Sequence, residues 1–261
     1  MKRLSALAAL SLLGTPASAR ELKVCADPNN LPFSNAKGEG FENRIIQMIA
    51  EELNADLTYV WWAQRRGNVR ETLNAGLCDL IPGAASSLEM VATTRPYYRS
   101  SYVALVREGP LTGINSLDDP RLGRLRVGVQ LIGDDGSNTP PAHALARRGI
   151  VENVQGFPIY GDYAEPTPQS AIVDAVAAGT LDVAFVWGPT AGYFAKREPV
   201  KLILTPVTPK ADGPALPMVF DVSMGVRRAD LALKREVEAA LKKRAAEVRA
   251  ILIRYGVPLV E

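Results

Sequence analysis

The sequence predicts a two-lobed α/β fold in which each lobe is a mainly parallel sheet flanked by helices. Three observations predict it. Short apolar runs alternate with segments of helical periodicity, as in sheets whose strands pair through right-handed crossovers. This alternation begins a second time near the middle of the chain. Two segments rich in Pro, Gly and Thr, residues 107–113 and 206–217, are typical of two chain crossings between lobes.

The first series of elements ends before residue 107. Apolar runs predict strands at 22–26, 57–61, 78–82 and 101–106. Apolar residues at helical spacing predict a helix over 41–53, and a second helix is expected near 69–75. Gly76 suits the left-handed position that closes that second helix.

The second series repeats the pattern. It predicts strands at 125–130, 154–159, 182–187 and 202–205, and helices at 142–148, 169–178 and 189–196. A strand near 219–226 and one long helix, capped by Asp230 and ending near 255, follow. We assign these last elements to the first lobe. It then comprises residues 20–108 and 216–261, with residues 109–215 as the second lobe and the ligand site in the cleft between them.

The first 19 residues have the pattern of a signal peptide. A basic start at Lys2 and Arg3 precedes a short apolar stretch and the small residues Ala17-Ser18-Ala19. We expect cleavage after Ala19 and export to the periplasm. Removing this segment leaves 28 basic and 28 acidic residues, a balance that argues against nucleic-acid binding. No later segment is apolar enough over sufficient length to predict a membrane span.

Cys25 and Cys78 are the two cysteines of the chain. An even count in an oxidising compartment favours a disulfide. Cys25, however, is expected near the end of the first strand and Cys78 at the start of the third. If those strands lie side by side in simple parallel register, the Cα atoms are farther apart than the roughly 7 Å that a disulfide spans. A disulfide and two buried thiols both remain open.

Several blocks resemble known proteins. The order LKVCADPNNLPFS, GFENRIIQMIA, LCDLIPGAASS and PYYRSSYV resembles the type II periplasmic solute-binding proteins of ABC importers. More narrowly, WWAQRRGNVRETLNAGLCD, LIGDDGSNTPPAHALARRG and FVWGPTAGYFA resemble the MxaJ/XoxJ family, which accompanies quinoprotein methanol dehydrogenases. This resemblance implies the type II periplasmic binding protein fold, a periplasmic location and a role in assembling or activating the dehydrogenase.

The charged anchors of amino-acid-binding relatives are missing. In those proteins a T-P-E-R segment supplies an Arg for the ligand carboxylate, whereas this chain has Met90 at the end of the corresponding stretch. An Asp for the ligand ammonium is replaced by Trp187. Met90 cannot form a bidentate pair with a carboxylate, and an amino acid would leave charges unpaired. Trp187 fits either an apolar cleft wall or a cover on the core.

Other residues are expected at the cleft or at a partner surface because they follow strand ends or flank aromatic residues. They are Asn29, Phe33, Trp61, Trp62, Gln64, Arg65, Arg66, Arg95, Tyr97 and Tyr98, together with Trp187. Neighbours on a strand point to opposite faces, so one ring of the Trp61-Trp62 pair should be buried. A solvated basic turn for Gln64–Arg66, and a packing role for one of the two tyrosines, are equally compatible with the sequence.

Catalytic and metal-binding patterns are sparse. The Asp- and Asn-containing run at 133–138 suits a hard cation in composition, but it lacks EF-hand spacing and fits a turn before a helix. His143 is the only histidine and has no nucleophile partner in a recognisable motif. We therefore expect that the protein has no enzymatic activity and binds neither a metal ion nor a cofactor.

Two functions follow from these observations. The first is a non-catalytic periplasmic accessory protein whose partner is a PQQ-dependent methanol dehydrogenase. The alternative is a solute-binding component of an ABC importer that takes a small, mostly apolar solute, because lobe closure about short crossings is a common switch.

Overall fold

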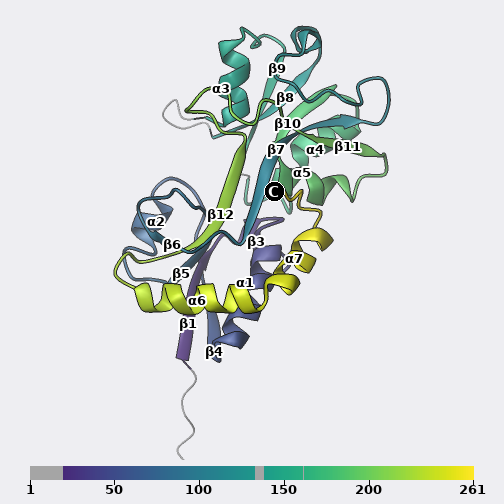
Figure 1. The fold of residues 1–261 in the computed structure, drawn as a ribbon. Coiled ribbons are helices and arrows are strands. Elements are labelled where there is room, and N and C mark those ends of the chain that lie inside the picture. The colour runs from purple at the N-terminus through teal and green to yellow at the C-terminus, as the bar shows by residue number, and fades with distance from the viewer. Residues whose placement is uncertain (1–19, 133–137, 161) are drawn as a thin grey trace, which may run out of the picture.

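The computed structural model describes residues 20–132, 138–160 and 162–261. The expected signal peptide and nearly all of the 133–138 run lie outside the described residues. The described chain forms two α/β lobes, one above the other in Figure 1. The predicted type II periplasmic binding protein fold is confirmed.

The first lobe is built on a sheet in the order β4-β1-β5-β12. Its parallel strands are β1 (Arg20–Ala26), β4 (Ala55–Trp61) and β5 (Leu80–Ala85), and β12 (Val219–Val226) joins β5 in antiparallel pairing. The helices are α1 (Phe41–Glu52), the short α2 (Asn68–Glu71), α6 (Leu231–Lys243) and α7 (Ala245–Arg254). Short strands complete it: β2 (Asn29–Asn30), β3 (Ser34–Asn35) and β6 (Ala92–Thr93).

The helical periodicity at 41–53 places one face of α1 in the core of this lobe. Phe41, Ile45, Ile46 and Ile49 are all fully buried. They share a core with residues of β1, β12, α6 and α7, so the last part of the chain packs with the first. Figure 1 shows α6 and α7, in yellow, against the lower lobe.

The second lobe has parallel strands in the order β10-β8-β9. These are β8 (Val127–Leu131), β9 (Val154–Pro158) and β10 (Val183–Trp187). The helices are α3 (Pro140–Arg147), α4 (Ala171–Ala177) and α5 (Gly188–Ala195), and 3₁₀ turns lie at Pro120–Gly123 and Pro168–Ser170.

One long strand, β7 (Tyr98–Arg107), belongs to both lobes. Its first residues, up to Ser101, pair with β12. From Tyr102 onward it pairs with β10, and with β11 (Leu202–Pro206) on its other side. The strand therefore begins earlier than the predicted 101–106 and runs through the junction of the two lobes.

Two predicted helices were wrong in extent. The long helix expected from Asp230 to 255 breaks at Arg244, where φ is −102° and ψ is 19°. The break lets both α6 and α7 contact α1, and Arg244 ion-pairs with Glu247 at 2.5 Å. The helix expected near 69–75 stops at Glu71, and the hydroxyl of the buried Thr72, which follows it, donates to the carbonyl of Asn68, its first residue.

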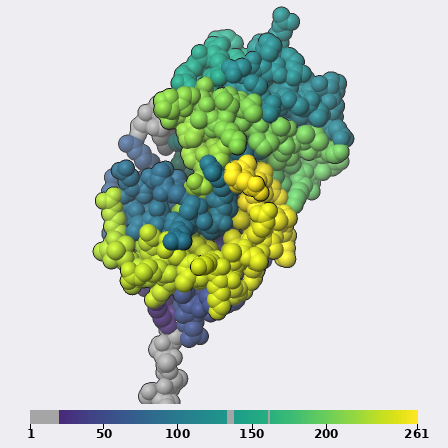
Figure 2. All heavy atoms as spheres, in the orientation of Figure 1, coloured from purple at the N-terminus to yellow at the C-terminus, as the bar shows by residue number. Residues whose placement is uncertain are grey.

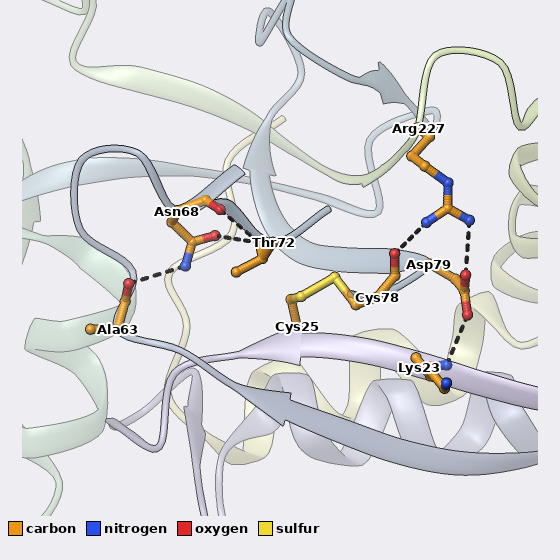
Figure 3. Close-up of a disulfide and its surroundings, with 8 residues drawn as sticks. All are labelled: Lys23, Cys25, Ala63, Asn68, Thr72, Cys78, Asp79 and Arg227. Atoms are coloured by element: carbon orange, nitrogen blue, oxygen red, sulfur yellow. Dashed lines mark hydrogen bonds and ion pairs between the residues drawn. A yellow bond between two sulfur atoms is a disulfide. The ribbon is translucent and has the colours of Figure 1, made fainter. Parts of the chain in front are cut away.

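A disulfide joins Cys25 to Cys78, with the Cα atoms 5.6 Å apart (Figure 3). The simple-register argument against it does not apply, because Cys78 precedes β5, which begins at Leu80. The adjacent Asp79 accepts a hydrogen bond from the Lys23 amide at 3.1 Å and ion-pairs with Arg227 at 2.8 Å. These contacts hold the turn before β5 against β1.

Candidate functional site

A cleft of about 450 Å³ lies between the lobes. It opens beyond the carboxyl ends of β1, β5, β8 and β10, where ligands bind in open α/β sheets. Its described lining is mainly aromatic and amide-bearing, with two carboxyl groups. The polar and aromatic members are Asp27, Asn30, Phe33, Glu42, Gln64, Tyr98, Tyr102, Gln130, Tyr160, Tyr163, Gln169, Trp187, Thr190 and Phe220.

Three rings from three strands form an aromatic cluster at the junction of the lobes. The Trp187 centroid lies 5.3 Å from that of Tyr102 and 5.8 Å from that of Phe220. The Tyr102 and Phe220 centroids are 6.3 Å apart, and all three pairs meet edge to face. Such contacts favour a fixed arrangement of rings.

Gln130, at the end of β8, holds Trp187 in place. Its side-chain Oε1 accepts a hydrogen bond from the Trp187 amide at 2.8 Å, and its carbonyl accepts one from the Thr139 hydroxyl at 2.5 Å. Gln130 and Thr139 are buried, so these bonds are shielded from water. The backbone on which the Trp187 ring stands is therefore fixed.

Glu42, in the first turn of α1, is a buried acid in the cleft lining. Burial raises its pKa to about 8, although a hydrogen bond from the Tyr97 hydroxyl to Oε1, at 3.3 Å, acts in the opposite direction. Among the described residues its Oε2 has no hydrogen-bond partner. Gly83 packs against this carboxyl group, and a Cβ added there would lie 2.5 Å from Oε1.

Hydrogen bonds between the lobes close one side of the cleft. The Tyr163 hydroxyl, from the second lobe, donates to Asp27 Oδ2 at 2.6 Å. Asn29 Nδ2 donates to the Glu165 carbonyl, and Gln169 Nε2 donates to the Asn29 carbonyl, both at 2.8 Å. The structure is therefore that of a closed cleft.

Asp27 organises the first-lobe side of this closure. It follows β1 directly, and its carboxylate also accepts hydrogen bonds from the amides of Asn29 and Gln64, both at 2.8 Å. The Arg65 guanidinium stands over the Tyr163 ring, 5.3 Å from its centroid. The turns of the first lobe that contain Asn29 and Gln64 thus meet the loop of the second lobe that contains Tyr163.

Of the residues expected at the cleft, four line it: Phe33, Gln64, Tyr98 and Trp187. Asn29 and Arg65 take part in the contacts that close it.

Five expected residues do not line the cleft. Trp61 stacks on Tyr59, with centroids 4.6 Å apart, and Trp62 is 42% exposed. Trp61 ends β4, the edge strand of the first-lobe sheet, Trp62 follows it, and the exposed Arg66 lies just beyond them. Arg95 and Tyr97 line a separate groove beside α6 and α7, which we call the helical groove. It is bordered by Arg95, Tyr97, Arg99, Glu238, Lys242, Arg249 and Leu259.

Met90 lies away from the cleft, contrary to its expected place as a substitute for a ligand-binding Arg. Its side chain is 47% exposed in a surface groove next to Arg228. No arginine or lysine is among the described residues of the cleft lining, so the cleft lacks a cationic anchor in any case.

Several cleft residues were not identified from the sequence, among them Asp27, Glu42, Tyr102, Gln130, Tyr163, Gln169 and Phe220. Asp27 and Gln130 lie at strand ends, so the rule that identified Asn29 could have found them. Glu42 gave no such signal, because it sits next to Phe41 in a helix that reads as an ordinary amphipathic element.

The described residues contain no cluster of three or more His, Cys, Asp or Glu that could hold a metal ion. Within the same residues, no helix combines the length and apolar character needed to cross a membrane. His143 lies outside the cleft lining, and its Nε2 accepts a hydrogen bond from the Asn138 amide at 3.1 Å.

Comparison with known proteins identifies the family of the chain. Residues 22–256 match the bacterial extracellular solute-binding proteins, family 3. The chain belongs to this family. The protein MoxJ of Methylorubrum extorquens AM1 is 33% identical over 285 residues, covering 98% of this chain and 93% of the relative. MoxJ of Paracoccus denitrificans is 31% identical, covering 97% and 95%.

A solved structure agrees with these relatives. The periplasmic binding protein XoxJ from Methylobacterium extorquens AM1 is 38% identical and matches with a TM-score of 0.75, over 92% of this chain and 99% of that one. The resemblance to the MxaJ/XoxJ group in the sequence blocks is therefore confirmed.

Proposed function

We propose that this family 3 protein is a periplasmic, non-catalytic accessory protein that assists assembly or activation of a PQQ-dependent methanol dehydrogenase. The observation that carries the proposal is similarity over nearly the whole chain to MoxJ and XoxJ proteins. The association with the dehydrogenase is what the resemblance of the sequence blocks to the MxaJ/XoxJ family implies.

The site is consistent with a non-catalytic role. The described cleft lining offers aromatic rings, amides and two buried carboxyl groups, those of Asp27 and Glu42. The Asp27 carboxylate accepts three hydrogen bonds, and the one from Tyr163 joins the two lobes. These groups bind and position rather than form an acid–base pair.

Reconstitution tests the proposal. Apo-dehydrogenase, PQQ and the metal ion that the dehydrogenase requires are incubated with and without this protein, and dye-linked methanol oxidation is followed. We expect a higher yield of active enzyme with the protein present, and its co-purification with the dehydrogenase. Neither co-purification nor any effect on the yield would contradict the proposal.

Two variants locate the docking face. Trp187→Ala alters the cleft, whereas Arg249→Ala alters the helical groove and leaves the cleft lining intact. Loss of stimulation in one variant alone assigns the partner to that surface.

The closed cleft of about 450 Å³ also favours a second function, delivery of a small solute to an ABC permease. A ligand that binds only the folded protein raises its melting temperature as its concentration rises. We expect a small, mostly apolar solute to raise Tm if this second function holds. A flat response across alcohols, acids and quinones would count against it.

A further inference from the structure

Two buried side-chain oxygen atoms of residues in the cleft lining lack hydrogen-bond partners among the described residues. They are Oε2 of Glu42, from α1 of the first lobe, and Oε1 of Gln169, from the 3₁₀ turn at Pro168–Ser170 of the second. Buried polar atoms are normally satisfied, because leaving them unpaired costs free energy. The two residues line the cleft from opposite lobes, and both oxygen atoms are themselves shielded from solvent.

The neighbouring surface is aromatic. Trp187, Tyr102 and Phe220 meet edge to face, with centroids 5.3 to 6.3 Å apart. Aromatic faces carry partial negative charge and attract cations, and sites that recognise organic ammonium ions use several rings together. The rings also accept an apolar body, so the cleft suits a molecule with both features.

The charged groups of the described lining also favour a cationic ligand. The ionisable acids of the described lining are Asp27 and Glu42, and no lysine or arginine lines the cavity. Arg65 is not part of the described lining, and its guanidinium stands over the Tyr163 ring. An anion would meet carboxyl groups without a cation to pair with, whereas a cation would meet two acids and several rings.

We propose that the cleft binds a small protonated amine with an apolar body, its N–H groups donating to Glu42 and Gln169. This ligand differs from an amino acid, because a carboxylate on the same molecule would lack an arginine to pair with. A polypeptide segment is disfavoured by the bonds from Tyr163, Asn29 and Gln169 that close the cleft. The inference depends on neither function proposed above.

The proposal implies a proton release. Burial raises the pKa of Glu42 to about 8, so the group is mostly neutral at pH 6. An ammonium ion beside it favours the carboxylate and lowers that pKa. The groups facing Glu42 are the phenols of Tyr59, Tyr97 and Tyr98, whose own pKa values are raised by burial. Because these phenols stay neutral, Glu42 is the group among them that changes charge. Affinity for the cation should therefore rise between pH 6 and pH 8, as Glu42 ionises.

Calorimetry with three molecules of one shape tests the charge preference. Cyclohexylammonium, cyclohexanol and cyclohexanecarboxylate are titrated into the purified full chain at pH 6 and pH 8. Cyclohexylammonium remains protonated at both values, since alkylammonium groups titrate near about 10.4. We expect the cation to bind at least tenfold more tightly than the alcohol, more tightly at pH 8, and the carboxylate not to bind. Equal binding of cation and alcohol, or tighter binding of the carboxylate, would overturn the proposal.

Variants test the assigned groups. Glu42→Gln should abolish the gain in affinity between pH 6 and pH 8 and reduce the cation-to-alcohol ratio at least tenfold. Glu51→Gln, on an exposed position of the same helix, is the matched control and should leave both unchanged. Trp187→Leu supplies an independent readout: it should lower the cation-to-alcohol ratio while cyclohexanol still binds. If the ratio is unchanged in both Glu42→Gln and Trp187→Leu, the assignment is wrong.

Discussion

Glu42 shows how one buried group couples stability to pH. Its pKa is 4.5 as a model carboxylic acid and about 8 in the folded protein. Between these values the unfolded chain is ionised while the folded chain keeps the proton, so stability must fall as pH rises. The contribution is fully present below about pH 4.5 and lost once the pH passes about 8.

Glu42→Gln removes this titration. We expect the variant to lose less stability than the parent between pH 5.5 and 7.5, the slopes differing by up to about 1.4 kcal/mol per pH unit. Urea unfolding at three pH values measures the difference. Parallel pH profiles for parent and variant would show that Glu42 titrates normally in the folded state.

Gly83 lies against the same carboxyl group and has φ of +69°. Gly83→Ala adds both left-handed strain and a Cβ 2.5 Å from Glu42 Oε1. Gly76→Ala is the matched control, because Gly76 has φ of +78° but nothing within 4 Å of an added Cβ. We expect Gly83→Ala to destabilise by about 1–3 kcal/mol more than the control, by the usual cost of overpacking. Equal losses in denaturant unfolding would mean that the carboxyl group moves aside freely.

At the scale of elements, the sequence predicts more than it does at the scale of residues. Strand positions follow from apolar runs, because buried parallel strands need them, and α1 follows from its spacing. The extent of a helix was less predictable: nothing local marks Arg244 as a break, which reflects packing of α6 and α7 on α1. The sequence also does not reveal that β4, which ends at Trp61, is the edge strand of the first-lobe sheet.

The disulfide ties the turn before β5 to β1, across 53 residues of sequence. Closing a loop of that length restricts the unfolded chain, and the chain-entropy relation gives about 4 kcal/mol. The double variant Cys25→Ala/Cys78→Ala should therefore unfold at lower denaturant concentration than the oxidised parent. Adding a thiol reductant should move the parent toward the variant and leave the variant unchanged. A reductant effect of equal size in both would exclude the bridge as its cause.

At the scale of the whole molecule, the hydrogen bond from Tyr163 to Asp27 is one of the contacts that join the two lobes across the cleft. Tyr163→Phe removes the hydrogen bond to Asp27 and keeps the ring under Arg65. We expect the ligand-free variant to open more often, which small-angle scattering would record as a larger radius of gyration. Tyr160→Phe, also in the cleft lining, serves as a comparison from the same lobe. An unchanged radius for Tyr163→Phe would place the control of closure elsewhere, for example at Asn29.

The two lobes share more than a hinge, because β7 gives its first residues to one lobe and the rest to the other. Figure 2 shows the C-terminal residues, in yellow, reaching the green atoms of the upper lobe. In this C-terminal segment the Pro258 carbonyl accepts a hydrogen bond from the Ser100 hydroxyl of β7. A chimera that exchanged lobes between relatives would have to cross over inside this strand, between Ser101 and Tyr102, where its partners change. A crossover after residue 108 would leave the donated lobe without the strand that lies between β10 and β11.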